Sequence, residues 1–365
     1  MTGAVRRVWD RLRGGGEHSV TVPPMDGALN PNSRLDEAEI IAAAEMPDNL
    51  CLRGGKTLFT SGATVLQMDR AGSAPSPLAS YDSAVTSLAA HGDALAVALA
   101  NGRVEITGGP HDGQKLSAVA GRPLRCVTAL AFADPHTLLI CQGSAQHPAE
   151  QWKHDLMQRG SSGSVWRVDL SSGNASCIAD RLAFPFGIMV SQSGAILVSE
   201  SWRHRLLSFA SGSTPPEIVL ADLPAYPARI APAANGRGAW LCLFAPRRQL
   251  TEFVLREPGF RERMMAEVAP DHWVGPTLAP MKSFLEPLQG GTLKKLAAIK
   301  PWAPSRSYGL VARLDEAYQP EFSFHSRADG TRHGITSAVE VDGRLLASSR
   351  GCDAVVGVAL NEAES

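Results

Sequence analysis

Two histidines occur where an imidazole can move protons. His333 lies in "GTRHGITS", directly before an apolar run that predicts a strand, and a neutral imidazole there is a candidate general base for ester or lactone hydrolysis. The alternative is a loop histidine that only makes hydrogen bonds. His154 and Asp155 are adjacent in "QWKHDLM" and offer a His–Asp dyad, but neighbouring residues of a helix point in different directions, which disfavours that pairing.

Other chemical signatures are incomplete or absent from the sequence. "RGGKT" (53–57) contains part of a phosphate-binding loop, but it lacks the G-x-x-x-x-G-K spacing and leads into a strand, so it predicts a hairpin turn. No G-x-S-x-G occurs, which excludes an esterase serine of that class. The 6 cysteines include no C-x-x-C pair and mostly lie in apolar runs. They indicate reduced thiols in a β core, with a zinc site or a disulfide frame as alternatives.

The composition limits the class of protein. The chain of 365 residues is 44% hydrophobic and 19% charged, and its net charge is -1. There is no basic excess for nucleic acid and no apolar run of transmembrane or signal-peptide length. We therefore expect a cytoplasmic protein that binds neither nucleic acid nor membrane.

A loose repeat predicts the elements that position the chemical groups. Copies of a strand–turn–strand pattern begin at Asn49, Val85, Val127, Gly187, Arg229 and Ile335. Each copy has β-rich runs joined by short turns that contain glycine, the signature of hairpins. A unit of a few strands cannot bury both faces alone, whereas such units can when they stack around an axis. The sequence predicts an all-β fold, a single six-bladed β-propeller over residues 36–362.

Three segments fall outside the repeat. "EAEIIAAAEM", before the first copy, is placed to supply the outer strand of the last blade. Insertions at about 145–163 and 257–307 interrupt blades three and five, and the second has apolar residues at helical spacing. We therefore expect a helical insertion that caps one mouth of the ring. Residues 1–35 have no usable periodicity and predict a flexible N-terminal arm.

The segments "FGIMVSQSGAILVSESWRHRLLSF", "DLPAYPARI" and "SYGLVARLDE…HGITSAVEVDGRLLASS" carry a family resemblance. They resemble the strictosidine synthase-like group of six-bladed propellers, which is related to the gluconolactonase and paraoxonase propellers. The similarity runs in consistent order from about residue 45 to 360. It implies the propeller fold and a small-molecule site in the central channel, whereas the activity has to be argued from the site residues.

The resemblance also implies a position for calcium. In the hydrolytic members, acidic and amide side chains at the starts of the innermost strands hold the ion, which takes about six to eight oxygen ligands. Carried over to this chain, those positions fall on Asp48, Gln142, Phe186 and the pair Ala228-Arg229. Only Asp48 and Gln142 offer an oxygen. We therefore expect no cofactor and a degenerate site at which calcium is disfavoured.

Arg229 strengthens this expectation. A cation about 4 Å from calcium is repelled by roughly 8 kcal/mol at an effective dielectric constant of about 20. Our hypothesis is that the guanidinium of Arg229 replaces the metal and pairs with Asp48, at a desolvation cost that cancels part of their attraction. Phe186 is then either a wall of a channel without metal chemistry or core packing beneath that channel.

The remaining site positions also follow from the resemblance. The acid/base glutamate of the named synthase falls near Thr336, and a threonine cannot carry out that proton transfer at neutral pH, so strictosidine synthesis is not expected. Glu200 lies in "ESW", which matches an "ETW"-like family segment, and is either structural or a polar group of the channel. Arg350 ends the second strand of blade six and is a second candidate cation of the channel.

Three functions remain open. The first is a small-molecule hydrolase of the ester or lactone type. Its catalytic groups are Asp48, Arg229 and His333, and its substrate contacts are Phe186, Gln142, Arg350, Glu200 and Thr336. The second is a non-catalytic propeller that binds a small anionic ligand through two arginines. The third is an interaction scaffold that contacts a partner protein through residues 257–307.

Overall fold

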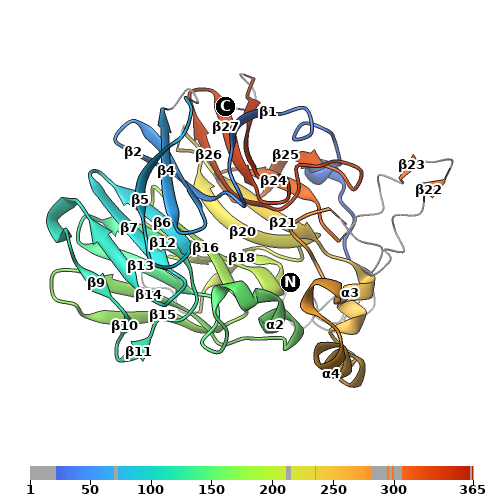
Figure 1. The fold of residues 1–365 in the computed structure, drawn as a ribbon, viewed down its shortest axis with the longest axis horizontal. Coiled ribbons are helices and arrows are strands. Elements are labelled where there is room, and N and C mark those ends of the chain that lie inside the picture. The colour runs from blue at the N-terminus through green and yellow to red at the C-terminus, as the bar shows by residue number, and fades with distance from the viewer. Residues whose placement is uncertain are drawn as a thin grey trace.

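The computed structural model describes residues 22–69, 73–210, 215–234, 236–280, 294–295, 298–299, 306–361 and 364. Six four-stranded antiparallel sheets stand side by side around a central axis (Figure 1). The chain passes from one sheet to the next in sequence order, and the innermost strands of the six blades are β2, β6, β12, β16, β20 and β26. The predicted six-bladed β-propeller is therefore confirmed.

The strands of each blade follow one another in the chain. Blades one and two are β2 (Asp48–Arg53), β3 (Lys56–Ser61), β4 (Thr64–Asp69), β5 (Ser76–Ser80) and β6 (Val85–His91), β7 (Ala94–Leu99), β8 (Val104–Thr107), β9 (Lys115–Leu116). Blades three and four are β12 (Val127–Asp134), β13 (Thr137–Gln142), β14 (Gly163–Asp169), β15 (Ala175–Leu182) and β16 (Pro185–Val190), β17 (Ile196–Glu200), β18 (Arg205–Phe209), β19 (Glu217–Leu220). Blade five is β20 (Ala225–Pro232), β21 (Ala239–Pro246), β24 (Gly309–Leu314), β25 (Pro320–Ser326), and blade six begins with β26 (Ile335–Val341), β27 (Arg344–Ser349), β28 (Ala354–Ala359).

The ring is closed by the N-terminal strand β1 (Glu39–Ala43). This strand pairs antiparallel with β28, with Glu39 opposite Gly357 and Ala43 opposite Ala354. It completes blade six from the other end of the chain, as "EAEIIAAAEM" predicted. Closure of this kind joins the first and last blades, so that neither leaves a free edge towards its neighbour.

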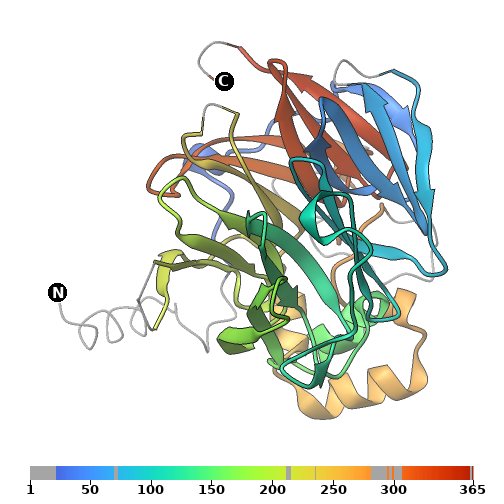
Figure 2. The same cartoon turned by 90° about the vertical axis from the view of Figure 1, so that its left-hand side faces the viewer.

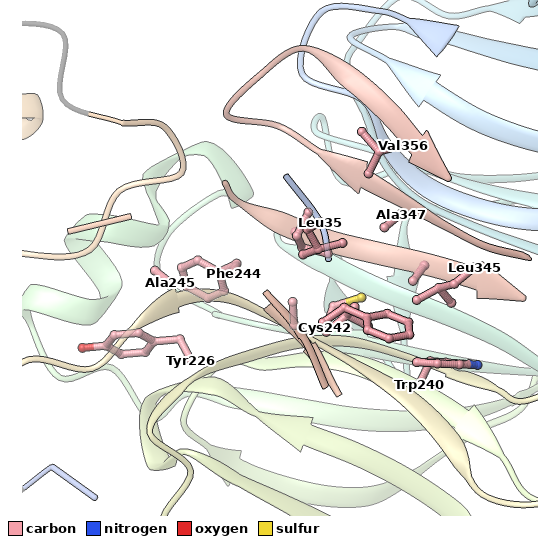
Figure 3. Close-up of a cluster of buried hydrophobic side chains, with 14 of the residues drawn as sticks. Leu35, Tyr226, Trp240, Cys242, Phe244, Ala245, Leu345, Ala347 and Val356 are labelled. Atoms are coloured by element: carbon pink, nitrogen blue, oxygen red, sulfur yellow. The ribbon is translucent and has the colours of Figure 1, made fainter. Parts of the chain in front are cut away.

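The hydrophobic core lies between neighbouring blades. Trp240 and Phe244, on the fully buried strand β21, belong to one cluster with Leu345 from β27 and Val356 from β28 (Figure 3). Burial of a large apolar side chain stabilises the fold by about 1.5–3 kcal/mol. Such packing fixes each blade against the next, and thereby fixes where the innermost strands begin around the axis.

The cysteines follow the same pattern. All six are free thiols, and Cys126, Cys141 and Cys242 are buried in strands or beside them. Burial raises the pKa of Cys126 to about 12 because the thiolate loses its hydration. These three residues are core thiols, as the first of the alternatives drawn from the sequence predicted, whereas Cys177 is exposed and Cys51 and Cys352 are half-buried.

Both insertions contain helices and lie near the same mouth (Figure 2). The first carries η3 (Ala149–Gln151) and α2 (Trp152–Met157); the second carries α3 (Gln249–Val254), α4 (Pro258–Glu267) and η5 (Pro270–His272). They touch each other, because Lys153 Nζ donates to the carbonyl of Pro270 at 3.3 Å and the rings of His154 and Trp273 lie 4.7 Å apart. The second insertion begins directly after β21, earlier than predicted, and much of its remainder, including most of the helical pattern expected at 278–302, lies outside the described residues.

The remaining short elements lie outside the four strands of each blade. They are η1 (Gly27–Leu29), η2 (Gly109–His111), η4 (Ser201–Arg203), β10 (Ala118–Val119), β11 (Arg122–Pro123), β22 (Lys294–Lys295) and β23 (Ala298–Ile299). In the part of the chain that the structure describes, no helix has both the length and the apolar character needed to cross a membrane. The cytoplasmic location stays a prediction.

The sequence predicted a flexible arm over residues 1–35, and in the structure residues 22–35 of this segment are attached to the propeller. Residues 1–21 lie outside the described residues. From residue 22 the chain is attached to the propeller: Leu35 is fully buried, and the Asn32 amide donates to the carbonyl of Ser323 on β25 at 2.8 Å. The Arg34 guanidinium pairs with Glu364 at 3.2 Å. Composition alone missed this anchoring because the contacts are made with residues about 300 positions away in the chain.

Candidate functional site in the central channel

The innermost strand of every blade contains a β-bulge near its start. The pairing register shifts between Asp48 and Cys51, Val85 and Ser87, Val127 and Ala129, Pro185 and Gly187, Pro227 and Ile230, and Ile335 and Ser337. A bulge adds an unpaired residue and re-aims its side chain. One side chain from each of these places lines the same pocket in the channel: Asp48, which pairs with Thr60 at the edge of the first bulge, and the unpaired Thr86, Thr128, Phe186, Arg229 and Thr336. Each blade thus contributes one residue to the axis.

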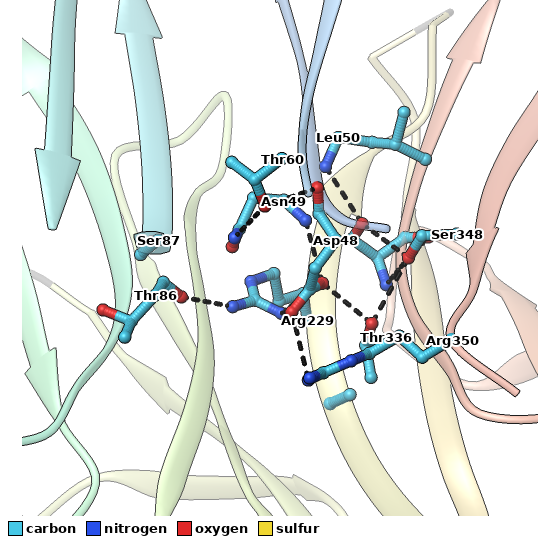
Figure 4. Close-up of polar contacts among 12 residues, drawn as sticks. Asp48, Asn49, Leu50, Thr60, Thr86, Ser87, Arg229, Thr336, Ser348 and Arg350 are labelled. Carbon is cyan, nitrogen blue, oxygen red and sulfur yellow. Dashed lines mark hydrogen bonds and ion pairs between the residues drawn. The ribbon is translucent and has the colours of Figure 1, made fainter. Parts of the chain in front are cut away.

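Arg229 joins the blades at this axis (Figure 4). Its Nη1 lies 2.8 and 3.0 Å from the two carboxylate oxygens of Asp48 on blade one. Its Nη2 donates to the carbonyl of Thr86 on blade two at 2.8 Å and to that of Thr128 on blade three at 3.1 Å. The guanidinium also lies 5.1 Å from the ring centre of Phe186 on blade four. The predicted ion pair is present, and the cation occupies the hub.

Asp48 is the anionic half of the hub. Its Oδ1 also accepts hydrogen bonds from the Asn49 amide and from the Thr336 hydroxyl, each at 2.8 Å. Its Oδ2 lies 3.7 Å from Nη1 of Arg350 on blade six. Since the residue is only 8% exposed, these donors replace the water that its carboxylate loses on burial.

Burial and the neighbouring charges have opposite effects on the charged form of Arg229. Burial lowers the pKa of Arg229 below its ordinary value, since the guanidinium loses its hydration, whereas the charge of Asp48 raises it and that of Arg350 lowers it. The face of an aromatic ring attracts a cation by about 0.5–2 kcal/mol, so Phe186 offsets part of the cost of burying the charge. Phe186 therefore both lines the channel and packs in the fold, and the two alternatives drawn from the sequence are not exclusive.

Arg350 is the second cation of the channel. Its side chain is 26% exposed, lines the pocket, and makes the 3.7 Å ion pair with Asp48. Within the described part of the chain, Nε is buried without a hydrogen-bond partner in both Arg350 and Arg229. The two residues differ at their terminal nitrogens: both of those of Arg229 donate to the protein, whereas those of Arg350 are engaged, among the described residues, only by the 3.7 Å ion pair. Arg350 is accordingly the guanidinium at the hub that has donors to spare for a ligand.

The pocket above the hub has two unlike walls. Its volume is about 480 Å³, and its ionic floor is formed by the hub. Aromatic side chains from blades three to five and from the first insertion line one side: Trp152, Phe184, Phe186, Trp202 and Phe244. Small residues of blades one and two line another: Thr60, Ser61, Gly62, Ala84 and Ala100. A cavity of this size accommodates a small molecule with a charged or carbonyl head and an apolar body.

His333 is not brought to this pocket. Its side chain is fully buried, its Nε2 donates to the carbonyl of Arg327 at 2.8 Å, and its Nδ1 lies 2.8 Å from the hydroxyl of Ser307. Burial lowers its pKa below 6.5. Both ring nitrogens are thus engaged in the fold, and the structure corrects the expectation that His333 faces the mouth as a general base. It is the hydrogen-bonded loop histidine of the alternative.

Glu200 and Gln142 also lie outside the pocket lining. Glu200 is fully buried; its carboxylate accepts from the Ala183 amide and the Arg203 guanidinium, each at 2.6 Å, and pairs with Arg205 at 2.5 Å. Gln142 Oε1 accepts from the Arg125 amide at 3.1 Å. Both side chains hold local structure, which corrects their expected contact with substrate. The sequence predicted the strands on which these two residues lie, but not the groups with which their side chains form hydrogen bonds.

The His154–Asp155 pair does not form a dyad. The carboxylate of Asp155 accepts a hydrogen bond from the indole of Trp202 at 2.8 Å, whereas the His154 ring packs against Trp273. Their side chains leave α2 in different directions, as expected of adjacent helical residues.

Thr86 and Thr128 were not predicted from the sequence. Each offers the carbonyl that binds Arg229, and each occupies the same position of its repeat as Thr336: "VTSL", "VTAL" and "ITSA". The repeated threonine after a β-branched residue is the signal that locates the bulge. The residue after Thr86 has a structural role, because Ser87 Oγ accepts the backbone amide of Leu130 in the next blade at 3.0 Å.

The hub does not fit a calcium ion. The guanidinium of Arg229 lies at the axis and already neutralises Asp48 there. Threonine hydroxyls and a phenylalanine fill the other bulge positions, so anionic oxygen is scarce. Among the described residues no group of three or more His, Cys, Asp and Glu side chains is arranged to hold a metal ion.

Comparison with known proteins identifies the fold. Neither the protein-family models nor the curated proteins contain a match to this chain. Among solved structures, it is similar to a gluconolactonase from Xanthomonas campestris, with a TM-score of 0.55 and 14% identity over 93% of this chain and 95% of that chain. It is also similar to a protein provisionally named a gluconolactonase, with a TM-score of 0.54 and 12% identity over 89% of this chain and 92% of that chain. At these identities the similarity establishes the propeller fold alone; the narrower resemblance to the strictosidine synthase-like group stays a prediction.

Proposed function

We propose that this propeller is a small-molecule hydrolase of the ester or lactone type that works without calcium. The observation that carries the proposal is the adjacency of the Asp48 carboxylate and the Arg350 guanidinium, 3.7 Å apart, at the floor of a pocket with an aromatic wall. A carboxylate can take a proton from water, and a guanidinium with free donors can stabilise the oxyanion that forms on a carbonyl. The shared fold of the two gluconolactonase structures supports this class of reaction without establishing it.

The reaction needs only the substrate and water. Asp48 accepts a proton as the water oxygen attacks the carbonyl carbon, and the electron pair of the C=O bond moves to its oxygen beside Arg350. The oxyanion then reforms the carbonyl, the ester C–O bond breaks, and the departing alkoxide takes the proton from Asp48. Arg229 keeps Asp48 in place throughout, while His333 takes no part. The acid product then loses its remaining proton to water, and the resulting carboxylate pairs with the same guanidinium.

A second candidate, binding without turnover, is favoured by the contacts of Asp48. Its Oδ1 accepts hydrogen bonds from Arg229, Thr336 and Asn49, so that oxygen is already engaged by the protein. In this function Arg350 binds an organic acid and nothing reacts. Contact with a partner protein through 257–307 stays a prediction, since most of the second half of that insertion lies outside the described residues.

The test compares turnover and binding after treatment with chelator. We expect hydrolysis of small lactones or aryl esters that survives chelation and falls about 10²–10³-fold in kcat/KM in Arg350→Gln, the loss typical of an oxyanion donor. Arg344→Gln is the matched control, because Arg344 begins β27, the strand that Arg350 directly follows, and pairs with Glu39 at the surface. Stabilisation by organic acids without turnover of any ester or lactone contradicts the hydrolase and supports the second candidate.

A further inference from the structure

The aromatic residues of the pocket form one connected wall. The rings of Phe184 and Trp202 stack at 4.5 Å, and Phe186 meets Phe244 edge to face at 5.8 Å. Trp152 lies edge to face on Phe244 at 5.6 Å and 6.3 Å from Trp202. Each of these five side chains lines the pocket. A wall of this kind offers dispersion and ring contacts but few hydrogen-bond partners.

Trp152 differs from the other members of the wall in its origin. Phe184, Phe186 and Trp202 belong to blade four or its entrance, and Phe244 to blade five, whereas Trp152 begins α2 in the blade-three insertion. It therefore overhangs the mouth from a segment that the blade itself does not need. The propeller alone would leave this side of the pocket open.

A buried hydrogen bond fixes this overhang. Asp155, one turn after Trp152 and 1% exposed, accepts from the indole nitrogen of Trp202 at 2.8 Å. The chain then turns tightly around the carboxylate: the Gly160 amide donates to the Asp155 carbonyl at 2.8 Å, and a Cβ at Gly160 would lie 2.4 Å from the carboxylate oxygens. Because Trp202 itself stacks on Phe184, the hydrogen bond links the insertion to the wall.

We propose that Trp152 is a specificity-determining residue, positioned by Asp155, which makes the pocket select a flat apolar ring adjoining a carboxylate or carbonyl head over a polyhydroxylated ligand. The head lies at Arg350 and the ring lies along the aromatic wall. A sugar lactone or sugar acid in the same place loses water from its hydroxyls, and the aromatic wall does not replace those hydrogen bonds. This inference rests on the proposed function only for the location of the ligand, since binding alone can test it.

Binding of two acids to the intact protein tests the selection. We expect 3-phenylpropionate to bind at least about tenfold more tightly than gluconate, as one or two good ring contacts give about 1.4 kcal/mol. Trp152→Ala is expected to remove most of this ratio and Trp152→Phe to retain it. Phe253→Ala is the matched control, because Phe253 is a 52% exposed aromatic on α3 and is not part of the pocket lining. Equal or tighter binding of gluconate overturns the proposal, as does an unchanged ratio in Trp152→Ala.

Substitutions at Asp155 test whether this residue positions Trp152. Asp155→Ala is expected to weaken binding of 3-phenylpropionate several-fold with little change for gluconate, whereas Asp155→Asn keeps an oxygen acceptor for Trp202 and restores the preference. If Asp155→Ala does not fold, Trp202→Phe removes the same hydrogen bond from the other side and is expected to lower the ratio. A ratio unchanged in folded Asp155→Ala or Trp202→Phe contradicts the positioning role.

Where turnover exists, the loss in Asp155→Ala appears in KM for ring substrates and not in kcat. A protein that discriminates these acids but hydrolyses nothing leaves this inference standing and removes the hydrolase.

Discussion

The guanidinium of Arg229 on blade five and the carboxylate of Asp48 on blade one meet across the axis of the propeller, 2.8 Å apart. The pair lies at the point where each blade contributes a residue at or beside a β-bulge, and the other terminal nitrogen of Arg229 binds the carbonyls of Thr86 and Thr128. A cation fixed to the chain therefore holds together the part of the ring at which the resemblance implies calcium in the hydrolytic relatives.

The hub pair is expected to contribute to stability. Arg229→Met leaves the buried Asp48 without its closest cation, and breaking a buried pair by removing one partner costs about 3–5 kcal/mol in the free energy of unfolding. Urea denaturation measures this loss. Arg237→Gln is the control, because Arg237 is an exposed arginine of the same blade whose ion pair with Glu316 is 3.5 Å long. If the two variants unfold at the same urea concentration, the hub assigned to Arg229 is wrong. In a double-mutant cycle, adding Asp48→Asn to Arg229→Met should cost less than the sum of the single changes.

Calcium is expected to leave the protein unchanged. An ion present at about 100 times its dissociation constant stabilises a fold by about 2.7 kcal/mol, which a thermal unfolding experiment detects easily. Because Arg229 repels a divalent cation from the axis, we expect the same unfolding temperature in millimolar calcium and after chelation. A rise in that temperature with calcium, lost again on adding chelator, shows that the axial cation does not replace the metal.

Three buried histidines predict that stability falls in mild acid. Burial lowers the pKa of His204, His325 and His333 below the ordinary 6.5, to about 3 for His325. The unfolded chain binds protons at these residues more readily than the folded one, so stability is complete above about 6.5 and is lost as the pH falls towards about 3.

His325→Gln is expected to make the unfolding free energy depend less steeply on pH across this window, by up to about 1.4 kcal/mol per pH unit. Denaturation at a series of pH values measures the slope. His91→Gln, a surface change on β6, is the control. An unaltered slope in His325→Gln contradicts the assignment of a buried neutral imidazole at this position.

Glu200 is expected to affect folding and not ligand binding. Its carboxylate accepts from Arg203, Arg205 and the Ala183 amide in a fully buried position. Glu200→Gln removes the charge that both arginines face, and a hydrogen bond to a charged group contributes about 1.5–3 kcal/mol. We expect a loss of unfolding free energy of that order, while the dissociation constant for an organic acid stays the same. Glu217→Gln, an exposed change in the same blade, is the control, and weaker acid binding by Glu200→Gln at unchanged stability reverses this assignment.

The sequence by itself determined the architecture. Hairpin-forming runs at regular spacing cannot bury their faces singly, so the repeat predicted the ring, and the apolar strand before the first copy predicted its closure by β1. The sequence also predicted that Asp48 and Arg229 form a pair. The resemblance assigns each segment to a blade and thereby places the starts of the innermost strands, where these two residues lie, at the same axis. The repeated "VT" and "IT" dipeptides carried the positions of Thr86 and Thr128, although only the bulges reveal their meaning.

Only the tertiary structure decided which polar side chains are free to act. His333, Glu200 and Gln142 occupy strands or loops near the axis, yet each is held by partners 3 to 26 residues away on other strands or loops, and the residue types alone do not reveal those contacts. In the described ranges of the chain, the terminal nitrogens of Arg350 make only an ion pair with Asp48. Trp152 lies at the mouth because its ring packs against Phe244 of another blade. The physical reason is that residue types and their spacing in the sequence determine on which strand or loop a side chain lies. Burial and competition for hydrogen bonds in the folded protein determine which polar side chains remain available to a ligand.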